Sequence, residues 1–441
     1  MKASLAKHPF FTGTLLLTAA GVLSRIIGFF YRIFLSRTIG AEGLGIYQLI
    51  FPVTAICFSL TSAGIQTSIS RYVSLEIGNH NPKAAKQYLY IGLCISILLS
   101  LASGFLIWEN ADFISASLLG EVRCAPLLKI IAFSYVPCCI HSCISGYFYG
   151  QKKAAIPAVS QLVEQLVRVG SVYLIYAIVQ NNGGQMTIAM ATWGVTLGEI
   201  GSMLVSVSFM GSEPAAGNIS AHTGLLLKMA IPLTANRIIL NLFTSVENVM
   251  IPNRLKLFGY TTTEALSVFG ILTGMAMAII MFPAVITNSV SVMLLPMISE
   301  AQAKKDIHLI KRAISRTVES CLLLGFLSTL AFLLLGDFIG NVLFANSLAG
   351  TFITTLSWIC PFLYLSTTLT SILHGLGYPG ITFLLSLGSC GIRILFVLFA
   401  IPAIGIRGYL YGLLISHILI TLLSVYIIYI KTSKYAVHQK I

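Results

Sequence analysis

The sequence of 441 residues is strongly apolar, with 56% hydrophobic residues and only 9% charged residues. Because soluble domains carry charge on about a quarter of their residues, this chain has too few polar side chains to cover a globule in water. The formal net charge of +13 would favour nucleic acid as the partner of a soluble protein. The placement of the charges in alternate loops explains it without such a partner, so the composition predicts an integral membrane protein with no nucleic-acid function.

Twelve apolar segments follow one another along the chain, separated by short polar connections. A membrane-spanning helix needs ~20 mainly apolar residues, and these segments meet that length. We therefore predict an all-α polytopic membrane protein with about twelve transmembrane helices. The predicted segments are residues 11–36, 44–72, 86–108, 125–149, 154–180, 186–210, 224–252, 265–296, 314–345, 351–375, 380–402 and 406–430.

A stretch with loop composition, residues 212–223, lies near the middle of the chain and separates the first six segments from the last six. Its Gly, Pro, Ser and Asn residues are typical of a connection rather than of a helix. We predict an N-terminal six-helix lobe over residues 1–211, a cytoplasmic linker over 212–223, and a C-terminal six-helix lobe over 224–441.

Matching features in the two predicted lobes indicate an internal repeat. Gly150 ends one segment and Arg168 follows 18 residues later, while Gly375 ends another and Arg393 follows at the same distance. Repeats of six helices have the same orientation in the membrane, and transporters built in this way bind their substrate between the halves. The repeat therefore favours a transporter that works by alternating access.

Basic residues are concentrated in alternate connections between the segments. An excess of Lys and Arg marks the cytoplasmic side of a polytopic protein. This pattern predicts a multi-pass protein of the plasma membrane with both termini in the cytoplasm. The basic set consists of Lys2, Lys7, Arg71, Lys83, Lys86, Lys152, Lys153, Lys228, Lys304, Lys305, Lys311, Arg312, Arg316, Lys431, Lys434 and Lys440.

Three arginines in the segments that open the two lobes are candidates for contacts with an anionic substrate. A charged side chain at the centre of a bilayer costs ~2.5–3.5 kcal/mol on insertion scales, so it usually faces a cavity or a partner. Arg25 and Arg32 stand seven residues apart on one helical face, and Arg237 lies in the seventh segment. Guanidinium groups suit phosphate because they donate two parallel hydrogen bonds and remain charged. The alternative is that Arg25 and Arg32 extend to a membrane interface.

Carboxylates inside the apolar segments are candidates for coupling transport to a cation or proton. Glu164 and Arg168 are placed at i and i+4, a spacing that favours an ion pair. Such a pair is structural, unless Arg168 binds the substrate and frees Glu164 for coupling. Glu199 is a second coupling candidate. Arg393 has no acidic residue nearby in the sequence, which leaves it free to meet an anion.

The sequence shows no pattern of a metal site, a cofactor site or an enzyme. Its nine cysteines lack paired CxxC spacing, and no two histidines have the spacing of metal ligands. Walker A, HExxH, GxSxG and Gly-rich dinucleotide motifs do not occur. We expect no metal, no cofactor and no catalysis, so the energy for transport comes from ion gradients, the membrane potential or the substrate's own gradient.

The first segment and its exit, residues 23–47, read LSRIIGFFYRIFLSRTIGAEGLGIY, and residues 282–306 read FPAVITNSVSVMLLPMISEAQAKKD. Together with residues 374–379 and 404–408, these stretches resemble the stage V sporulation protein B family of polysaccharide and lipid-linked oligosaccharide flippases, which is related to the lipid II flippases. The resemblance covers nearly the whole chain. It implies the multidrug/oligosaccharidyl-lipid/polysaccharide exporter fold, with two six-helix lobes around a central cavity.

The resemblance also implies an outward flippase for lipid-linked cell-wall precursors, including those of the spore cortex. In related lipid II flippases, arginines of the first helix line a cationic cavity. Arg25 matches that motif directly, whereas Arg32 matches it after a shift of one residue and is followed by Ile33 instead of an aspartate.

Three functions remain open at the level of the sequence. The first is a flippase for undecaprenyl-pyrophosphate-linked sugar, with Arg25, Arg32, Arg168, Arg237 and Arg393 as substrate contacts and Glu164 and Glu199 as coupling groups. The second is a cation-coupled multidrug exporter of the same fold, and the third is a non-transporting scaffold for cell-wall synthesis. The expected partners are the lipid-linked oligosaccharide, membrane lipids and cell-wall synthesis enzymes.

Overall fold

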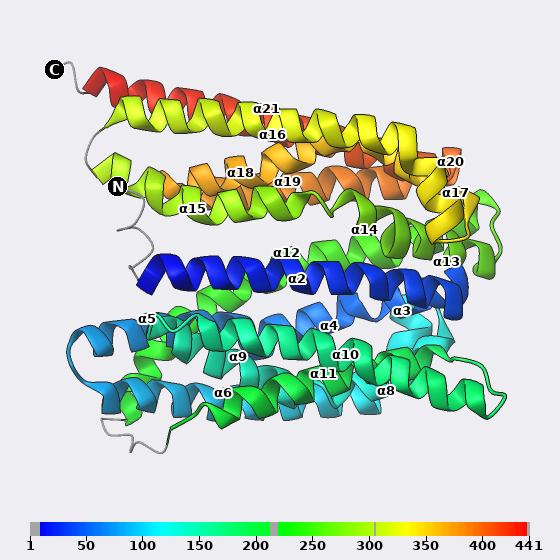
Figure 1. Ribbon diagram of the computed structural model, residues 1–441, viewed down its shortest axis with the longest axis horizontal. Coiled ribbons are helices and arrows are strands. Elements are labelled where there is room, and N and C mark those ends of the chain that lie inside the picture. Colours follow the sequence, from blue (N-terminus) through cyan, green and yellow to red (C-terminus); the bar gives the residue numbers. More distant parts are fainter. Residues whose placement is uncertain (1–8, 212–218, 304–305, 439–441) are drawn as a thin grey trace. The chain divides into compact units, whose positions relative to one another are not determined.

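The computed structural model describes residues 9–211, 219–303 and 306–438 (Figure 1). Within these residues every regular element is a helix and no strand occurs. The helices form two compact units, Met1–Ser245 and Val246–Ile441. The boundary between the units lies inside the long helix α12 (Ile219–Phe258), so the first part of α12 packs with the first unit.

The first unit contains the helices that precede α12 and the beginning of α12 itself. Two of its predicted spans are each made of several helical pieces. Its elements are α2 (Pro9–Thr38), α3 (Gly40–Leu49), α4 (Phe51–Phe58), η1 (Ser59–Ala63), α5 (Gly64–Gly78), α6 (Pro82–Glu109), α7 (Ala111–Phe113), η2 (Ile114–Leu119), η3 (Val122–Cys124), α8 (Ala125–Ala132), α9 (Tyr135–Gly150), α10 (Ala155–Asn181) and α11 (Ile188–Ser208).

The second unit contains the end of α12 and the helices that follow it. Its elements are α13 (Thr262–Gly270), η4 (Ile271–Ala276), α14 (Met277–Ile280), α15 (Ala284–Ala303), α16 (Ile307–Phe338), η5 (Ile339–Leu343), α17 (Ser347–Leu356), η6 (Ser357–Ile359), α18 (Cys360–Gly375), α19 (Pro379–Leu395), η7 (Phe396–Ala400), α20 (Ile401–Ile404) and α21 (Ile406–His438).

The prediction of about twelve transmembrane helices is confirmed. Within the described residues, eleven helices are long and apolar enough to cross a membrane, and a bent pair, Val122–Ala132 with Tyr135–Gly150, makes a twelfth if it counts as one span. The predicted segment 265–296 is interrupted after Ile280, and α15 begins only at Ala284. Pro283 lies in this break, where its missing N–H removes one helical hydrogen bond.

The predicted linker, residues 212–223, lies mostly outside the described residues. Its last part is helical, because α12 begins at Ile219 and continues for 40 residues. The helix of the predicted seventh segment therefore starts at Ile219, earlier than the predicted residue 224. The predicted lobe boundaries stay a prediction.

Several helices begin with a side chain that caps their free N–H groups. Asn81 accepts a hydrogen bond from Ala84 N at the start of α6, and Asp306 accepts one from Leu309 N at the start of α16. Thr261 and Glu264 form a reciprocal capping box at α13. Such caps satisfy backbone donors that have no partner in the helix, and they fix where each of these helices begins.

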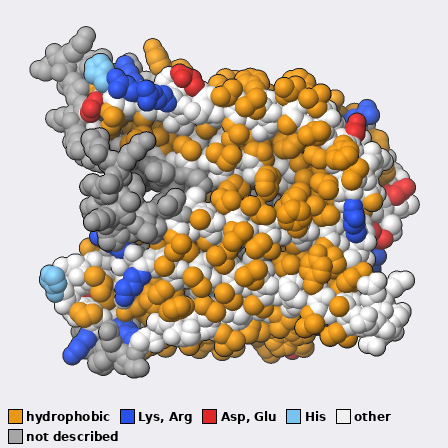
Figure 2. Space-filling model, in the orientation of Figure 1, with side chains coloured by type: hydrophobic (Ala, Val, Ile, Leu, Met, Phe, Trp, Pro, Cys, Tyr) orange, Lys and Arg blue, Asp and Glu red, His pale blue; other side chains and the backbone are white. Residues whose placement is uncertain are grey.

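The surface of the helices is apolar over their middle parts. On the face shown in Figure 2, hydrophobic side chains cover the middle of the helices and charged side chains gather near their ends. Leu98, Phe105, Leu334 and Phe399 are each exposed over at least 65% of their surface. Exposed leucine and phenylalanine in such numbers require lipid as the surrounding medium.

Glycines allow α10 and α11 to approach closely in the first unit. A Cβ atom at Gly194 would lie 2.2 Å from Val172 Cγ2, and one at Gly198 would lie 2.8 Å from the carbonyl oxygen of Glu164. Because neither position has room for a side chain, the two helices meet backbone to backbone. This contact brings the polar residues of α10 next to those of α11.

Candidate functional site

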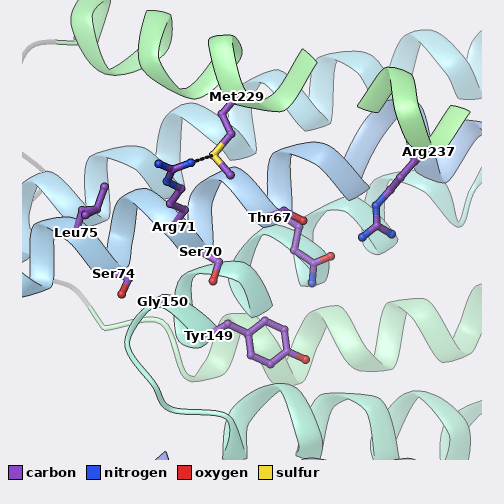
Figure 3. Close-up of a pocket in the computed structure, with 10 residues that line it drawn as sticks. Thr67, Ser70, Arg71, Ser74, Leu75, Tyr149, Gly150, Met229 and Arg237 are labelled. Carbon is purple, nitrogen blue, oxygen red and sulfur yellow. Dashed lines mark hydrogen bonds between the residues drawn. The ribbon is translucent and has the colours of Figure 1, made fainter. Parts of the chain in front are cut away.

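A pocket of about 650 Å³ lies in the first unit, among helices α5, α9 and α12 (Figure 3). Polar side chains form much of its wall, although the helices around it are apolar on average. The residues that line it are Gln66, Thr67, Ser70, Arg71, Ser74, Leu75, Tyr149, Gly150, Met229 and Arg237. We call it the arginine pocket.

The polar wall of the arginine pocket follows from the spacing of residues on α5. Gln66, Ser70 and Ser74 lie four residues apart and share one face of the helix, and Thr67 and Arg71 lie beside them. Helix α9 approaches this face closely at Gly150, where a Cβ atom would be 2.6 Å from the carbonyl oxygen of Ser70. Because glycine has no side chain, α9 can pack directly against α5 at this point. The hydroxyl groups of Ser70 and Ser74 line the pocket.

Two arginines from different helices give the arginine pocket its charge. Arg71 on α5 and Arg237 on α12 are both exposed, and within the described residues neither forms an ion pair with a carboxylate. Arg71 makes a weak contact with Met229, in which Nη1 lies 3.7 Å from Sδ. In Figure 3 the Arg71 side chain points toward Met229, and Arg237 extends from α12 toward α5. Both guanidinium groups remain available to an anion.

A second polar cluster lies among α9, α10 and α11 of the first unit. Arg168 Nη2 donates to Glu164 Oε1, one turn away on α10, and lies 4.0 Å from Glu199 Oε1 on α11. His141 Nε2 on α9 lies 2.9 Å from Glu199 Oε2, without the alignment of a hydrogen bond. These four side chains are between 13% and 22% exposed. The predicted ion pair between Glu164 and Arg168 is therefore present, and it belongs to a larger network.

The second unit has its own buried ion pair. Arg393 Nε on α19 lies 2.7 Å from Glu247 Oε1 on α12, and the hydroxyl of Tyr409 donates to the same oxygen at 2.8 Å. Arg393 Nη1 also donates to Ser389 Oγ at 2.8 Å. The expectation that Arg393 is free of carboxylates was wrong. Its partner comes from 146 positions earlier in the chain, a contact that local spacing cannot indicate.

The five predicted substrate arginines differ in whether they line the pocket and in whether a carboxylate pairs with them. Arg237 lines the arginine pocket, and none of the other four predicted arginines does. Arg25 is exposed and Arg32 is half-buried on α2, and neither has an ion-pair partner in the part of the chain that the structure describes. Arg168 and Arg393 are each held by a carboxylate. Their roles in binding stay predictions.

Arg71 is the pocket residue that the sequence reasoning missed. The loop pattern placed it among the cytoplasmic basic residues, but it lies inside α5, two turns before the end of that helix at Gly78. The signal in the sequence was the row of polar residues at positions 66, 67, 70, 71 and 74, which has the i, i+4 spacing of one helical face.

Comparison with known proteins places the chain in a family. Residues 10–302 match the model of the family described as "Polysaccharide biosynthesis protein". The chain is 30% identical over 438 residues to stage V sporulation protein B of Bacillus subtilis. This match covers 95% of this chain and 83% of that protein. It is 22% identical over 342 residues to the lipid II flippase MurJ of the same organism, covering 71% of this chain and 62% of that protein.

Solved structures agree on the fold. The inward-facing conformation of a multidrug resistance MATE family transporter of the MOP superfamily aligns with a TM-score of 0.76 at 14% sequence identity, and the match covers 93% of this chain and 95% of that one. At this identity the likeness shows the fold alone. The family match and the relatives show a multi-pass membrane protein that belongs to the polysaccharide biosynthesis protein family, and the fold agrees with a membrane transporter or flippase.

Proposed function

We propose that this protein is a flippase that moves an undecaprenyl-pyrophosphate-linked sugar, a precursor of the cell wall or of another polysaccharide, to the outer leaflet by alternating access. The arginine pocket is the observation that supports this function best. It combines two arginines without carboxylate partners, a row of hydroxyl groups, and a position on helices that otherwise face an apolar medium. The work is transport and not catalysis.

A pyrophosphate-linked sugar matches the chemistry of the pocket. Guanidinium groups bind phosphate oxygens through paired, charge-assisted hydrogen bonds, and Arg71 and Arg237 offer two such groups. Hydroxyl and amide groups of Gln66, Ser70 and Ser74 suit a sugar. The volume of about 650 Å³ is within the range of ~300–1,000 Å³ that is usual for ligand sites. The polyprenyl tail stays in the bilayer beside the exposed apolar side chains.

The paired arginines are weaker candidates for the headgroup. Diverting Arg168 or Arg393 to a substrate would leave Glu164 or Glu247 as an unpaired buried charge, which costs about 3–5 kcal/mol. Arg25 and Arg32 carry no such penalty, so we keep them as secondary contacts. Glu164 and Glu199 remain the candidates for coupling to a cation or proton.

Transport of a fluorescent undecaprenyl-pyrophosphate-linked sugar by the protein in liposomes tests this function. We expect Arg237→Ala and Arg71→Ala each to lower the initial rate roughly 10- to 100-fold, because a hydrogen bond to a charged group contributes about 1.5–3 kcal/mol. Lys228→Ala is the matched control, since it removes one positive charge from α12 outside the pocket lining. Full activity in both pocket variants would contradict the proposal. A purified wild-type protein that moved no substrate at all would instead favour a non-transporting scaffold.

One observation favours a second function, the cation-coupled multidrug exporter. The first unit holds two half-buried carboxylates, Glu164 and Glu199, within one network of charges. If drug export is the function, expression of the protein should confer drug resistance that Glu199→Gln abolishes and Arg71→Ala leaves intact. Resistance that depends on neither residue would count against it.

The relatives and the charge pattern support a proposal for the cellular role and the orientation. We propose a role in making spore cortex peptidoglycan, because the relative that is 30% identical is named for a stage of sporulation. We also propose that the protein lies in the plasma membrane with both termini in the cytoplasm, where enzymes of cell-wall synthesis supply the lipid-linked substrate. Complementation of a Bacillus strain that lacks stage V sporulation protein B tests the role in sporulation.

A further inference from the structure

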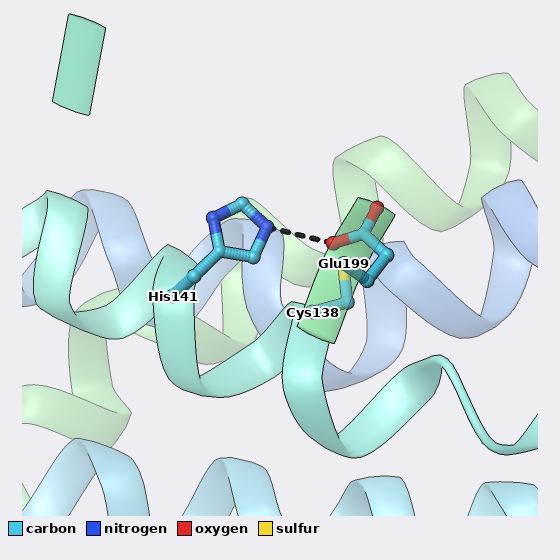
Figure 4. A group of neighbouring side chains, drawn as sticks. All are labelled: Cys138, His141 and Glu199. Atoms are coloured by element: carbon cyan, nitrogen blue, oxygen red, sulfur yellow. Dashed lines mark ion pairs between the residues drawn. The ribbon is translucent and has the colours of Figure 1, made fainter. Parts of the chain in front are cut away.

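Three side chains with metal-binding atoms converge between α9 and α11 of the first unit (Figure 4). The Sγ atom of Cys138, a ring nitrogen of His141 and a carboxylate oxygen of Glu199 all lie within 4.8 Å of one another. We propose that these residues form a binding site for a transition-metal ion with affinity for thiolate and imidazole, and that Zn²⁺ is the ion that fits it best.

The fold explains how the three residues meet. Cys138 and His141 are three positions apart on α9, so they project from one face of that helix. Figure 4 shows this face turned toward Glu199 on α11. The packing of α11 is fixed by Gly198, where the close contact with α10 permits no side chain, and by Thr196, whose hydroxyl donates to Ile130 O of α8 at 3.3 Å. The position of α11, and with it of Glu199, therefore depends on contacts that do not involve the three proposed ligands.

The distances suit a tetrahedral zinc ion. Zinc binds thiolate at about 2.3 Å, imidazole nitrogen at about 2.0–2.1 Å and carboxylate oxygen at about 2.0–2.2 Å. Ligand atoms on a tetrahedron of that size are roughly 3.4–3.8 Å apart, so the side chains need only small rotations from separations of at most 4.8 Å. Three protein ligands leave a fourth position for water or for another small ligand.

The ligand types select against the ions that usually drive transport. Na⁺, Mg²⁺ and Ca²⁺ prefer sites made of oxygen, whereas thiolate and imidazole favour zinc and its neighbours. Cys138 and His141 supply one sulfur and one nitrogen, and only Glu199 supplies oxygen. The proposal is therefore distinct from a coupling site for an alkali cation at Glu164 and Glu199.

The charges around the site also balance. A divalent ion bound by the Cys138 thiolate and the Glu199 carboxylate forms a neutral group. Arg168 approaches Glu199 to 4.0 Å, but its own charge is offset by Glu164, with which it shares a hydrogen bond. A neutral metal group beside a neutral ion pair avoids the large cost of a net charge in an apolar interior.

Metal binding would affect both the stability of the first unit and the rate of transport. A bound ion would tie α9 to α11, and it would engage Glu199, one of the two carboxylates proposed for coupling. We therefore expect the ion to stabilise the first unit and to slow transport. The binding of the ion itself does not depend on the identity of the transported substrate.

The test uses Co²⁺ as a spectroscopic probe on the full-length protein in detergent or nanodiscs. We expect wild-type protein to bind one equivalent, with thiolate-to-cobalt charge-transfer absorption that added Zn²⁺ removes. Cys138→Ser should lose this absorption, and His141→Gln should weaken Zn²⁺ binding by more than about 10-fold. Cys139→Ser is the matched control, because Cys139 is the adjacent thiol on α9 and is not part of the cluster.

A second measurement guards against variants that fail to fold. Zn²⁺ should raise the melting temperature of wild-type protein and of Cys139→Ser, and it should leave that of Cys138→Ser unchanged. Absence of the cobalt–thiolate absorption in folded wild-type protein would overturn the proposal. So would absorption that persists in Cys138→Ser, since it would arise from another cysteine.

Discussion

Within the described residues, the buried charges of Glu247 and Arg393 pair with each other, and the two arginines of the pocket have no such partner. Glu247 is 3% exposed and Arg393 is 14% exposed, and they contact each other at 2.7 Å. Arg71 and Arg237, in contrast, are exposed and have no carboxylate partner within the described residues. Removal of a pocket arginine should therefore affect transport, whereas removal of a paired arginine should affect stability first.

The pair between Glu247 and Arg393 gives a prediction for stability. Arg393→Met leaves the Glu247 carboxylate buried without a cation, and we expect the free energy of unfolding to fall by about 3–5 kcal/mol. The double variant Glu247→Gln/Arg393→Met should lose less than the sum of the two single changes. Thermal unfolding in detergent measures these effects, with Arg407→Met as the control at an exposed arginine. A melting temperature equal to the wild type in Arg393→Met would show that the pair is not structural.

The contacts that could be predicted from the sequence lie within one helix, and those that could not join different helices. Glu164 and Arg168 are one helical turn apart, so their contact could be predicted from spacing alone. The partner of Arg393 is 146 positions away, and Arg71 and Arg237 meet the same pocket from two helices. Contacts of that kind depend on how helices pack, which hydrophobicity and spacing do not specify.

At the scale of the helices, the contact between α10 and α11 supports the buried charge network. A side chain at Gly198 would collide with the backbone of α10, since a Cβ atom there would be 2.8 Å from Glu164 O and 3.1 Å from Arg168 Cβ. We expect Gly198→Val to lower the free energy of unfolding by about 1–3 kcal/mol through overpacking. It should also disturb the ion pair between Glu164 and Arg168.

Gly170 provides the matched control for that prediction. It lies on α10 itself, and a Cβ atom there would meet nothing within 4 Å. Gly170→Ala should be neutral or stabilise the protein by up to about 1 kcal/mol, because alanine favours the helix. Equal melting temperatures for Gly198→Val and Gly170→Ala would contradict the close contact between the two helices.

The helices were the most predictable part of the structure. Long apolar runs identify membrane-spanning helices because no unpaired backbone is tolerated in lipid, and this requirement does not depend on tertiary contacts. Boundaries were less predictable: the predicted segment 44–72 extends over Gly40–Gly78 in the structure. The next helix, α6, begins at Pro82 behind the capping side chain of Asn81, and a hydropathy average does not detect such a cap.

For the whole molecule, the distribution of charge predicts the orientation in the membrane. Helix α10 extends from Ala155 to Asn181, a length of about 40 Å that is sufficient to cross the bilayer. The turn before it carries Lys152 and Lys153, both exposed, whereas the turn after it carries Asn182 and no basic residue through Thr187. The basic end should face the cytoplasm.

Labelling of single cysteines tests this orientation within one helix. In a variant without native cysteines, Lys153→Cys should react with a membrane-impermeant maleimide only after the cells are opened, and Asn182→Cys should react in intact cells. Both positions are exposed in the structure, so a failure to react reflects the side of the membrane and not burial. The reverse pattern would place the basic loops outside, and with them the end of α5 near which Arg71 lies. A precursor made in the cytoplasm would then meet the wrong end of the first unit, and the proposed direction of transport would have to be abandoned.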